Sequence, residues 1–142
     1  TQSDITVTVA DPNKVVFTGQ ATTPSIANTA FSTQPIVTIQ DAFGNTRTAD
    51  TDTITIAGFT DSSCTVPVAE GMLTGTLTED AISGIADFAG NLIKYGTPGN
   101  LYLKASTGAL TTACSEVIVV NPVAIADLAC SQGSSSSTID LT

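Results

Sequence analysis

The side chains with the most chemical potential in this chain are three cysteines, Cys64, Cys114 and Cys130, because the sequence contains no histidine. None of the cysteines forms a CxxC pair, which argues against a zinc or redox site. We predict a disulfide between Cys64 and Cys114, which would contribute roughly 3–4 kcal/mol on the chain-entropy estimate. The alternative is two buried free thiols. Cys130 is then unpaired, or its partner is missing from this chain.

Catalytic groups are sparse, although serine and threonine hydroxyls abound. Without histidine, the commonest base for activating a hydroxyl nucleophile is missing. Glu70 or Glu79 with Asp80 could imitate a carboxylate pair, but nothing in the pattern groups them in a cleft. We therefore expect that the protein is not an enzyme and has no catalytic residue.

Acidic side chains are the candidates for metal binding, because hard carboxylate oxygens suit calcium. Asp11, Asp50 and Asp52 are the residues that we would assign to a calcium ion near a junction between modules. The sequence has no DxDxDG loop, however, and scattered acids more often form a solvated face. Calcium is thus the one cofactor left open, and we expect no other.

An intramolecular isopeptide bond is a further candidate, since it needs a lysine, an asparagine or aspartate and a nearby carboxylic acid. Lys14 opens the first strand of the expected module, and Asn121 follows its last strand. This pair is therefore the candidate crosslink. The plain alternative is that the lysines, Lys14 included, are simply solvated.

The segment from residue 41 to residue 45, Asp-Ala-Phe-Gly-Asn, has the composition of a tight turn. Asp41 can accept hydrogen bonds from the backbone amides of the turn, and Gly44 can take a positive φ. We expect Phe43 to plug the end of the fold, and we count Asn45 among the structural residues. A ligand-binding loop is the functional alternative.

The charge balance disfavours some partners, because four Lys and Arg residues oppose 13 Asp and Glu residues, for a net charge of −9. Such a chain repels a phosphate backbone and an anionic membrane surface, so we expect no nucleic-acid partner. No run of about 18 apolar residues is present, so we expect no membrane insertion. Few charges and many hydroxyls favour strands, because threonine suits a pleated surface.

Apolar and hydroxyl residues alternate along most of the chain, which is the pattern of half-buried strands. Turn residues such as Asp11-Pro12 and Ser83-Gly84 separate these runs. About seven short strands predict an all-β sandwich. The expected strands are 5–9, 14–18, 36–39, 54–56, 73–78, 85–88, 101–105 and 116–120, with another at 138–141. Among the aromatic residues we expect these in the core: Phe17, Phe43, Phe88 and Tyr102; we expect these in loops: Phe59 and Tyr95.

The chain repeats one pattern at its two ends. Residues 3–7 resemble residues 115–119, and Asp11-Pro12 is matched by Asn121-Pro122. The offset is about 110 residues, which is the size of one sandwich domain. We therefore expect a leading strand or the end of a preceding module at 1–12 and one complete module at 13–122. Residues 123–142 would begin a following module or form a C-terminal extension. Alternatively, both ends pack as edge strands of one larger domain.

Residues 14–45, above all Gln40-Asp41-Ala42-Phe43-Gly44-Asn45, resemble the bacterial Ig-like repeats of large surface proteins, the invasin/intimin-like and "big" adhesin types. Segments 75–77, 83–88 and 101–108 fit the same pattern, so the resemblance covers roughly residues 13–121. It implies an immunoglobulin-like β-sandwich of about seven antiparallel strands, repeated in series and without catalysis. The cysteine pair departs from the pattern, since many such repeats lack it. Residues 127–142 resemble the start of a fibronectin-III-like repeat over a short stretch.

This resemblance implies a structural spacer or stalk repeat in a bacterial cell-surface adhesin or fibre, located outside the cell. Its partners would be the neighbouring repeats of the same chain. One alternative is a binding module whose loops recognise a host or prey surface protein or a glycan. Another is an assembly module, in which an unpaired terminal strand at 1–10 or 138–142 pairs with a neighbouring chain.

Overall fold

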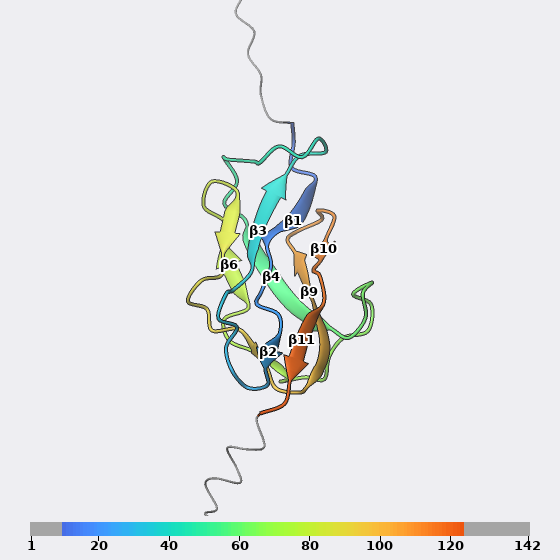
Figure 1. Ribbon diagram of the computed structural model, residues 1–142. Helices are drawn as coiled ribbons and strands as arrows, with labels where there is room; N and C mark the ends of the chain where they lie inside the picture. Colours follow the sequence, from blue (N-terminus) through green and yellow to red (C-terminus); the bar gives the residue numbers. More distant parts are fainter. Residues whose placement is uncertain (1–9, 124–142) are drawn as a thin grey trace, which may run out of the picture.

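The structure, a computed structural model, describes residues 10–123 and is all-β over this range, as predicted (Figure 1). No helix is present among these residues, and so none that could cross a membrane. The strands are β1 (Lys14–Gly19), β2 (Ser25–Ile26), β3 (Ile36–Gln40), β4 (Thr53–Phe59), β5 (Leu73–Thr74), β6 (Thr78–Asp80), β7 (Ile85–Asp87), β8 (Lys94–Tyr95), β9 (Gly99–Ser106), β10 (Ala113–Cys114) and β11 (Ile118–Asn121).

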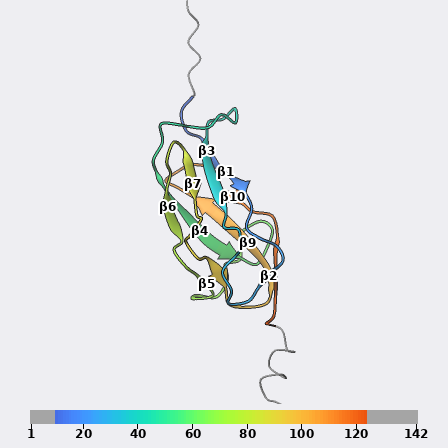
Figure 2. The same ribbon diagram turned by 60° about the vertical axis from the view of Figure 1, so that its left-hand side comes forward.

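Two larger sheets and one small ribbon organise these strands. The first sheet has the order β1-β3-β7, and the second has the order β2-β11-β9-β4-β6, with β10 also paired to β9. Figure 2 shows β4 and β9 side by side in the second sheet, with β1 and β3 together in the first. β5 and β8 form the two-stranded ribbon. All of these pairings are antiparallel except the one between β11 and β2, which is parallel.

Alternation along the strands builds a core that both larger sheets share. In β4 the odd-numbered threonines are exposed, while Ile54 and Ile56 are buried. In β9 the inward positions are Leu101 and Leu103, which are fully buried. These residues belong to the same hydrophobic cluster as Val37 of β3. Burial of one face of each sheet is therefore what the alternating sequence encodes.

Most of the strands predicted within residues 10–123 are present, but one predicted strand corresponds to two strands in the structure. The segment predicted as a single strand at 73–78 is two strands, β5 and β6, which pair with different partners. Gly75 between them has φ +110°, and a side chain there would meet the backbone of Leu92 at 2.6 Å. The predicted strands at 5–9 and 138–141 lie outside the described residues, as does Cys130.

The aromatic residues were assigned correctly only in part. Phe88 is fully buried, as predicted. Phe43 is 81% exposed, so the prediction that it plugs the end of the fold is wrong. Tyr95 is buried rather than placed in a loop, because it lies in β8 and its side chain joins the core. The remaining aromatic residues of the prediction are half-buried: Phe17, Phe59 and Tyr102.

Candidate functional site

The turn after β3 is organised by one carboxylate. Asp41 is fully buried, and its Oδ1 accepts hydrogen bonds from the backbone amides of Phe43 and Asn45, each at 2.9 Å. Its Oδ2 accepts the Asn45 side-chain amide at 3.0 Å and the backbone amide of Ala10 at 3.2 Å. Gly44 takes φ +91°, the left-handed conformation that the turn requires. The carboxylate thus holds the predicted turn residues together and also binds the chain that enters the fold.

A second carboxylate turn, which sequence reasoning missed, lies in the loop after β4. Asp61 accepts hydrogen bonds from the backbone amides of Thr65 at 2.9 Å and Val66 at 2.8 Å. The Thr65 hydroxyl donates to its other oxygen at 2.7 Å. An aspartate followed closely by Ser and Thr residues is a local signal for such a turn, so the sequence contained the information needed to find it.

Both turn aspartates have depressed pKa values. Burial raises the pKa of Asp41, but the hydrogen bonds from Asn45, Phe43 and Ala10 outweigh it and leave the pKa at about 2. For Asp61, the Val66 amide is the largest cause, followed by the Thr65 hydroxyl, and its pKa is also about 2. In each case the donors favour the ionised carboxylate.

These pKa values predict acid sensitivity. A carboxylate with a folded pKa of about 2 and an ordinary pKa of 3.8 stabilises the fold fully above pH ~4. That contribution is lost as the pH falls from about 4 to about 2. The double variant Asp41→Asn/Asp61→Asn should therefore show a flatter dependence of melting temperature on pH across this window. Circular dichroism melts at several pH values measure it, and Glu70→Gln, at an exposed site, controls for the loss of a negative charge. A double variant with the wild-type slope would contradict the prediction.

The first part of the described chain runs parallel to the last part. At one end of this contact the Val15 amide donates to the Thr111 carbonyl, and the Thr111 amide donates to the Asn13 carbonyl, each at 3.0 Å. At the other end β2 pairs with β11, and the Ala27 amide donates to the Asn121 carbonyl at 2.8 Å. Residues 13–27 and 111–121 are thus joined at both ends, and we call them the terminal pair.

Two side chains fill the middle of the terminal pair, where no backbone ladder is formed. The Gln20 Oε1 accepts the Glu116 amide at 3.2 Å, and the Thr23 hydroxyl oxygen accepts the Val119 amide at 3.0 Å. They satisfy backbone donors on the outer side of the segment that carries β10 and β11. Sequence reasoning missed both roles, because they depend on the partner segment 96 residues away in each case.

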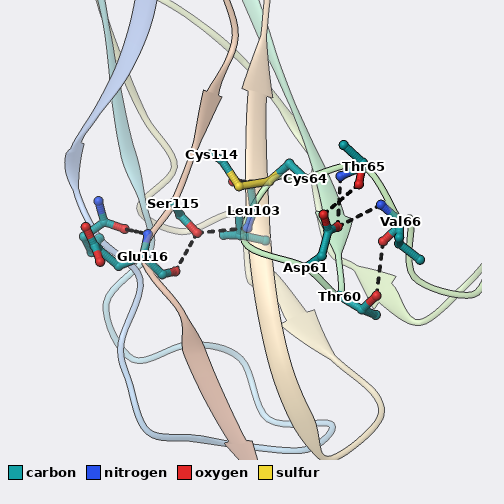
Figure 3. The surroundings of a disulfide bond; sticks show 10 residues. Thr60, Asp61, Cys64, Thr65, Val66, Leu103, Cys114, Ser115 and Glu116 are labelled. Carbon is teal, nitrogen blue, oxygen red and sulfur yellow. Dashed lines mark hydrogen bonds between the residues drawn. A yellow bond between two sulfur atoms is a disulfide. The ribbon is translucent and has the colours of Figure 1, made fainter.

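The predicted disulfide joins the loop after β4 to β10. The Cα atoms of Cys64 and Cys114 are 5.9 Å apart, and 50 residues separate them in the sequence. Figure 3 shows the bond close to Leu103 of β9, whose carbonyl oxygen is 3.7 Å from Cys64 Sγ. Next to it, Ser115 interrupts the last strand and its hydroxyl accepts the Leu103 amide at 2.9 Å. The disulfide therefore attaches the 60–68 loop covalently to β10, just before Ser115 separates β10 from β11.

The acidic residues assigned to calcium are not brought together. Among residues 10–123 no group of three or more His, Cys, Asp or Glu side chains could hold a metal ion. The Asp50 carboxylate is instead 3.4 Å from Arg47 Nε within its own loop. Asp11 and Asp52 are exposed. The arrangement therefore gives no support to a calcium site formed by these three aspartates.

The structure gives no support to the candidate crosslink between Lys14 and Asn121. Lys14 begins β1 beside Thr111, whereas Asn121 ends β11, ten residues further along the same extended segment. At about 3.3 Å per extended residue this places the pair about 30 Å apart. Figure 1 shows the start of β1 and the end of β11 at opposite ends of the molecule. No amide bond can form across that distance.

A shallow hollow of about 410 Å³ lies beside β7. Its wall combines Ser32, Thr33 and Gln34 with the apolar side chains of Phe31 and Leu92. Asp87 is the one carboxylate in this wall, and it accepts the Ala89 amide at 3.0 Å. The hollow therefore does not assemble a carboxylate pair of the kind that glycoside hydrolysis needs.

Comparison with known proteins assigns no family to the chain. A scan against protein-family models found no match, and a search of curated proteins found none either. The likeness to bacterial Ig-like repeats therefore rests on sequence motifs, and the function must be argued from the geometry described above.

Proposed function

We propose that the chain is an immunoglobulin-like β-sandwich that acts as a structural spacer in a bacterial cell-surface adhesin or fibre. The strand order supports this fold. Immunoglobulin domains place strands A, B and E in one sheet and strands C, F and G in the other. The sheets β1-β3-β7 and β11-β9-β4 follow that division, with β10 and β11 together in the position of strand G. The motif from Gln40 to Asn45 adds the family resemblance.

The observation that carries the spacer function is the terminal pair. The described chain enters at one end of the molecule and leaves at the other (Figure 1). Because residues 13–27 and 111–121 run parallel, a pull on the two ends slides one segment along the other. The hydrogen bonds between these parallel segments cross from one segment to the other, at a slant to the direction of that pull. They therefore share the load and must break together, which suits a module under tension.

The disulfide indicates where in or outside the cell the protein works, and the covering of β10 and β11 by residues 13–27 indicates which partners it has. A disulfide persists in oxidising surroundings, which supports a place outside the cell. Residues 13–27 cover the outer side of the strand formed by β10 and β11, so strand addition at this edge is disfavoured. The partners we propose are accordingly the neighbouring modules of the same polypeptide. In this proposal the chain has a mechanical role and no catalytic one.

Single-molecule stretching tests the proposal. The whole chain would be pulled through its two ends between marker modules of known unfolding force. The double variant Gln20→Leu/Thr23→Val removes both side-chain acceptors from the terminal pair. We expect it to unfold at lower force than the wild type, because fewer bonds share the load.

A matched control separates this effect from a general loss of stability. Thr53→Val makes the same change as Thr23→Val, but it removes a hydrogen bond to Asp80 between β4 and β6, away from the terminal pair. It should leave the unfolding force close to that of the wild type. If the control lowers the force as much as the double variant does, the terminal pair does not bear the load and the spacer argument fails.

A further inference from the structure

The two larger sheets differ in the side chains that they turn away from the shared core. In the second sheet these side chains are polar, since Thr53 and Thr55 of β4 and Thr78 of β6 are exposed. In the first sheet they are β-branched and mostly apolar, and apolar residues on both sides of a strand are the pattern of a sheet that is covered on both faces. We call this surface the outer face of the first sheet; its residues are Val16, Thr18, Ile36, Thr38, Ile82 and Ile85.

Strand register places four of these side chains in one row. Val16 of β1 lies opposite Thr38 of β3, and Thr38 lies opposite Ile85 of β7. Ile85 is in turn bridged to Ile82, in the turn that precedes β7. Residues directly opposite each other in antiparallel strands share one face. The row therefore crosses the whole sheet and continues onto the turn.

The described chain leaves much of the apolar surface of this face uncovered. Ile82 is 77% exposed and Ile85 is 42% exposed, while Val16 is half-buried. Ile36, in the next row, is half-buried and lines the hollow beside β7 together with Leu92, which is 65% exposed. Single exposed apolar residues are ordinary on a protein surface, but a group of them on one sheet face marks an interaction surface.

The outer face carries opposite charges at two diagonal corners. Lys14 begins β1 in the row of Gln40, and Asp87 ends β7 in the row of Ile36. β1 and β7 are the two outermost strands of this sheet (Figure 2). Neither Lys14 nor Asp87 forms an ion pair within residues 10–123. Both charges are therefore available to a partner that covers the face.

We propose that the outer face of the first sheet packs against the same face of a second copy of the chain, with Lys14 of each copy facing Asp87 of the other. A two-fold contact needs a self-complementary surface, and the diagonal charges provide one. Asp87 is the only acidic residue of β1, β3 and β7, which matters for a chain of net charge −9. The contact goes beyond the spacer function, since it joins two modules side by side whether or not they bear load.

Sedimentation of the full chain from micromolar to millimolar concentration tests the contact. All proteins carry Cys130→Ala, so that a disulfide between copies is not mistaken for the dimer. We expect the otherwise unaltered chain to shift from monomer to dimer as its concentration rises. Ile85→Asp should weaken the dimer by more than about 10-fold, because it buries a carboxylate without a partner in each copy.

Val119→Asp is the matched control. Val119 is 40% exposed in β11 of the second sheet, close to the value for Ile85, and the change adds the same charge. It should leave the dimer unchanged. Circular dichroism melts establish that each variant is folded. Equal weakening by both changes would overturn the proposal, because the added charge alone would then account for it.

Charge reversal tests the arrangement of the two copies. Lys14→Asp and Asp87→Lys should each weaken the dimer, because like charges then meet across it, and the two changes combined should restore it. A chain that stays monomeric over the whole concentration range would overturn the proposal. So would a dimer that Ile85→Asp leaves intact, or one that the combined reversal fails to restore. Oligomers that keep growing would overturn it too, since a two-fold contact closes at two copies.

Discussion

The double variant Cys64→Ala/Cys114→Ala should have a free energy of unfolding about 4 kcal/mol lower than the wild type, on the chain-entropy estimate for a closed loop of this length. The physical reason is that the bond closes a loop between residues 50 apart, and so removes conformations from the unfolded chain. In the folded state the disulfide also holds the 60–68 loop against β10. Urea denaturation of the oxidised protein and of the double variant measures the difference.

The third cysteine provides the control. Cys130→Ala makes the same chemical change outside the described residues and should leave the urea midpoint unchanged. A reducing agent should shift the wild type toward the double variant and leave that variant where it was. If the double variant is as stable as the wild type, the loop is held by its other contacts, among them the Asp61 turn.

The same bond should be visible under force. In the oxidised chain the residues between Cys64 and Cys114 cannot extend when the domain unfolds. Reduction should release them and lengthen the unfolded chain by about 175 Å, taking ~3.5 Å for each of the 50 residues. An unchanged length on reduction would show that the two cysteines are not joined in the chain under study.

Sequence patterns predicted those parts of the fold that depend on interactions between residues close together in the chain, namely strand alternation and the Asp41 turn. Alternation in β4 and β9 follows from burial of one face, and each strand carries that signal within a few residues. The turn at Asp41 is similarly local, since its carboxylate bonds to residues two and four positions on. The cysteine pairing was within reach because only one of three cysteines had to be left over.

What the sequence could not show depends on how distant segments meet. The parallel contact of β2 with β11, and the capping by Gln20 and Thr23, join residues about 96 positions apart. The candidate crosslink between Lys14 and Asn121 finds no support for the same reason, because it assumed that the first strand starts where the last one ends. The error at Phe43 is related, since turn chemistry defines the backbone but not the side of the molecule that the ring faces.

Gly84→Ala should be among the most destabilising single substitutions, at about 3 kcal/mol or more, because it combines two mechanisms of damage. Gly84 has φ +79°, a conformation that costs an alanine roughly 1–2 kcal/mol. A Cβ at this position would also lie 2.4 Å from the Arg47 carbonyl oxygen, and that oxygen belongs to the backbone and cannot swing aside. Movement would disturb both the bond from the Gly84 amide to Asp50 and the bond from the Ile39 amide to Gly84.

Gly90→Ala isolates the first of these mechanisms. Gly90 has φ +87°, almost the same conformation, but a Cβ there would meet no atom within 4 Å. It should therefore cost only the roughly 1–2 kcal/mol of backbone strain. The difference between the free energies of unfolding of the two variants, from urea denaturation, then measures the close approach of the turn between β6 and β7, which carries Gly84, to the Arg47 carbonyl. Equal losses would mean that the loop carrying the Arg47 carbonyl yields freely to the added Cβ, and would contradict the prediction.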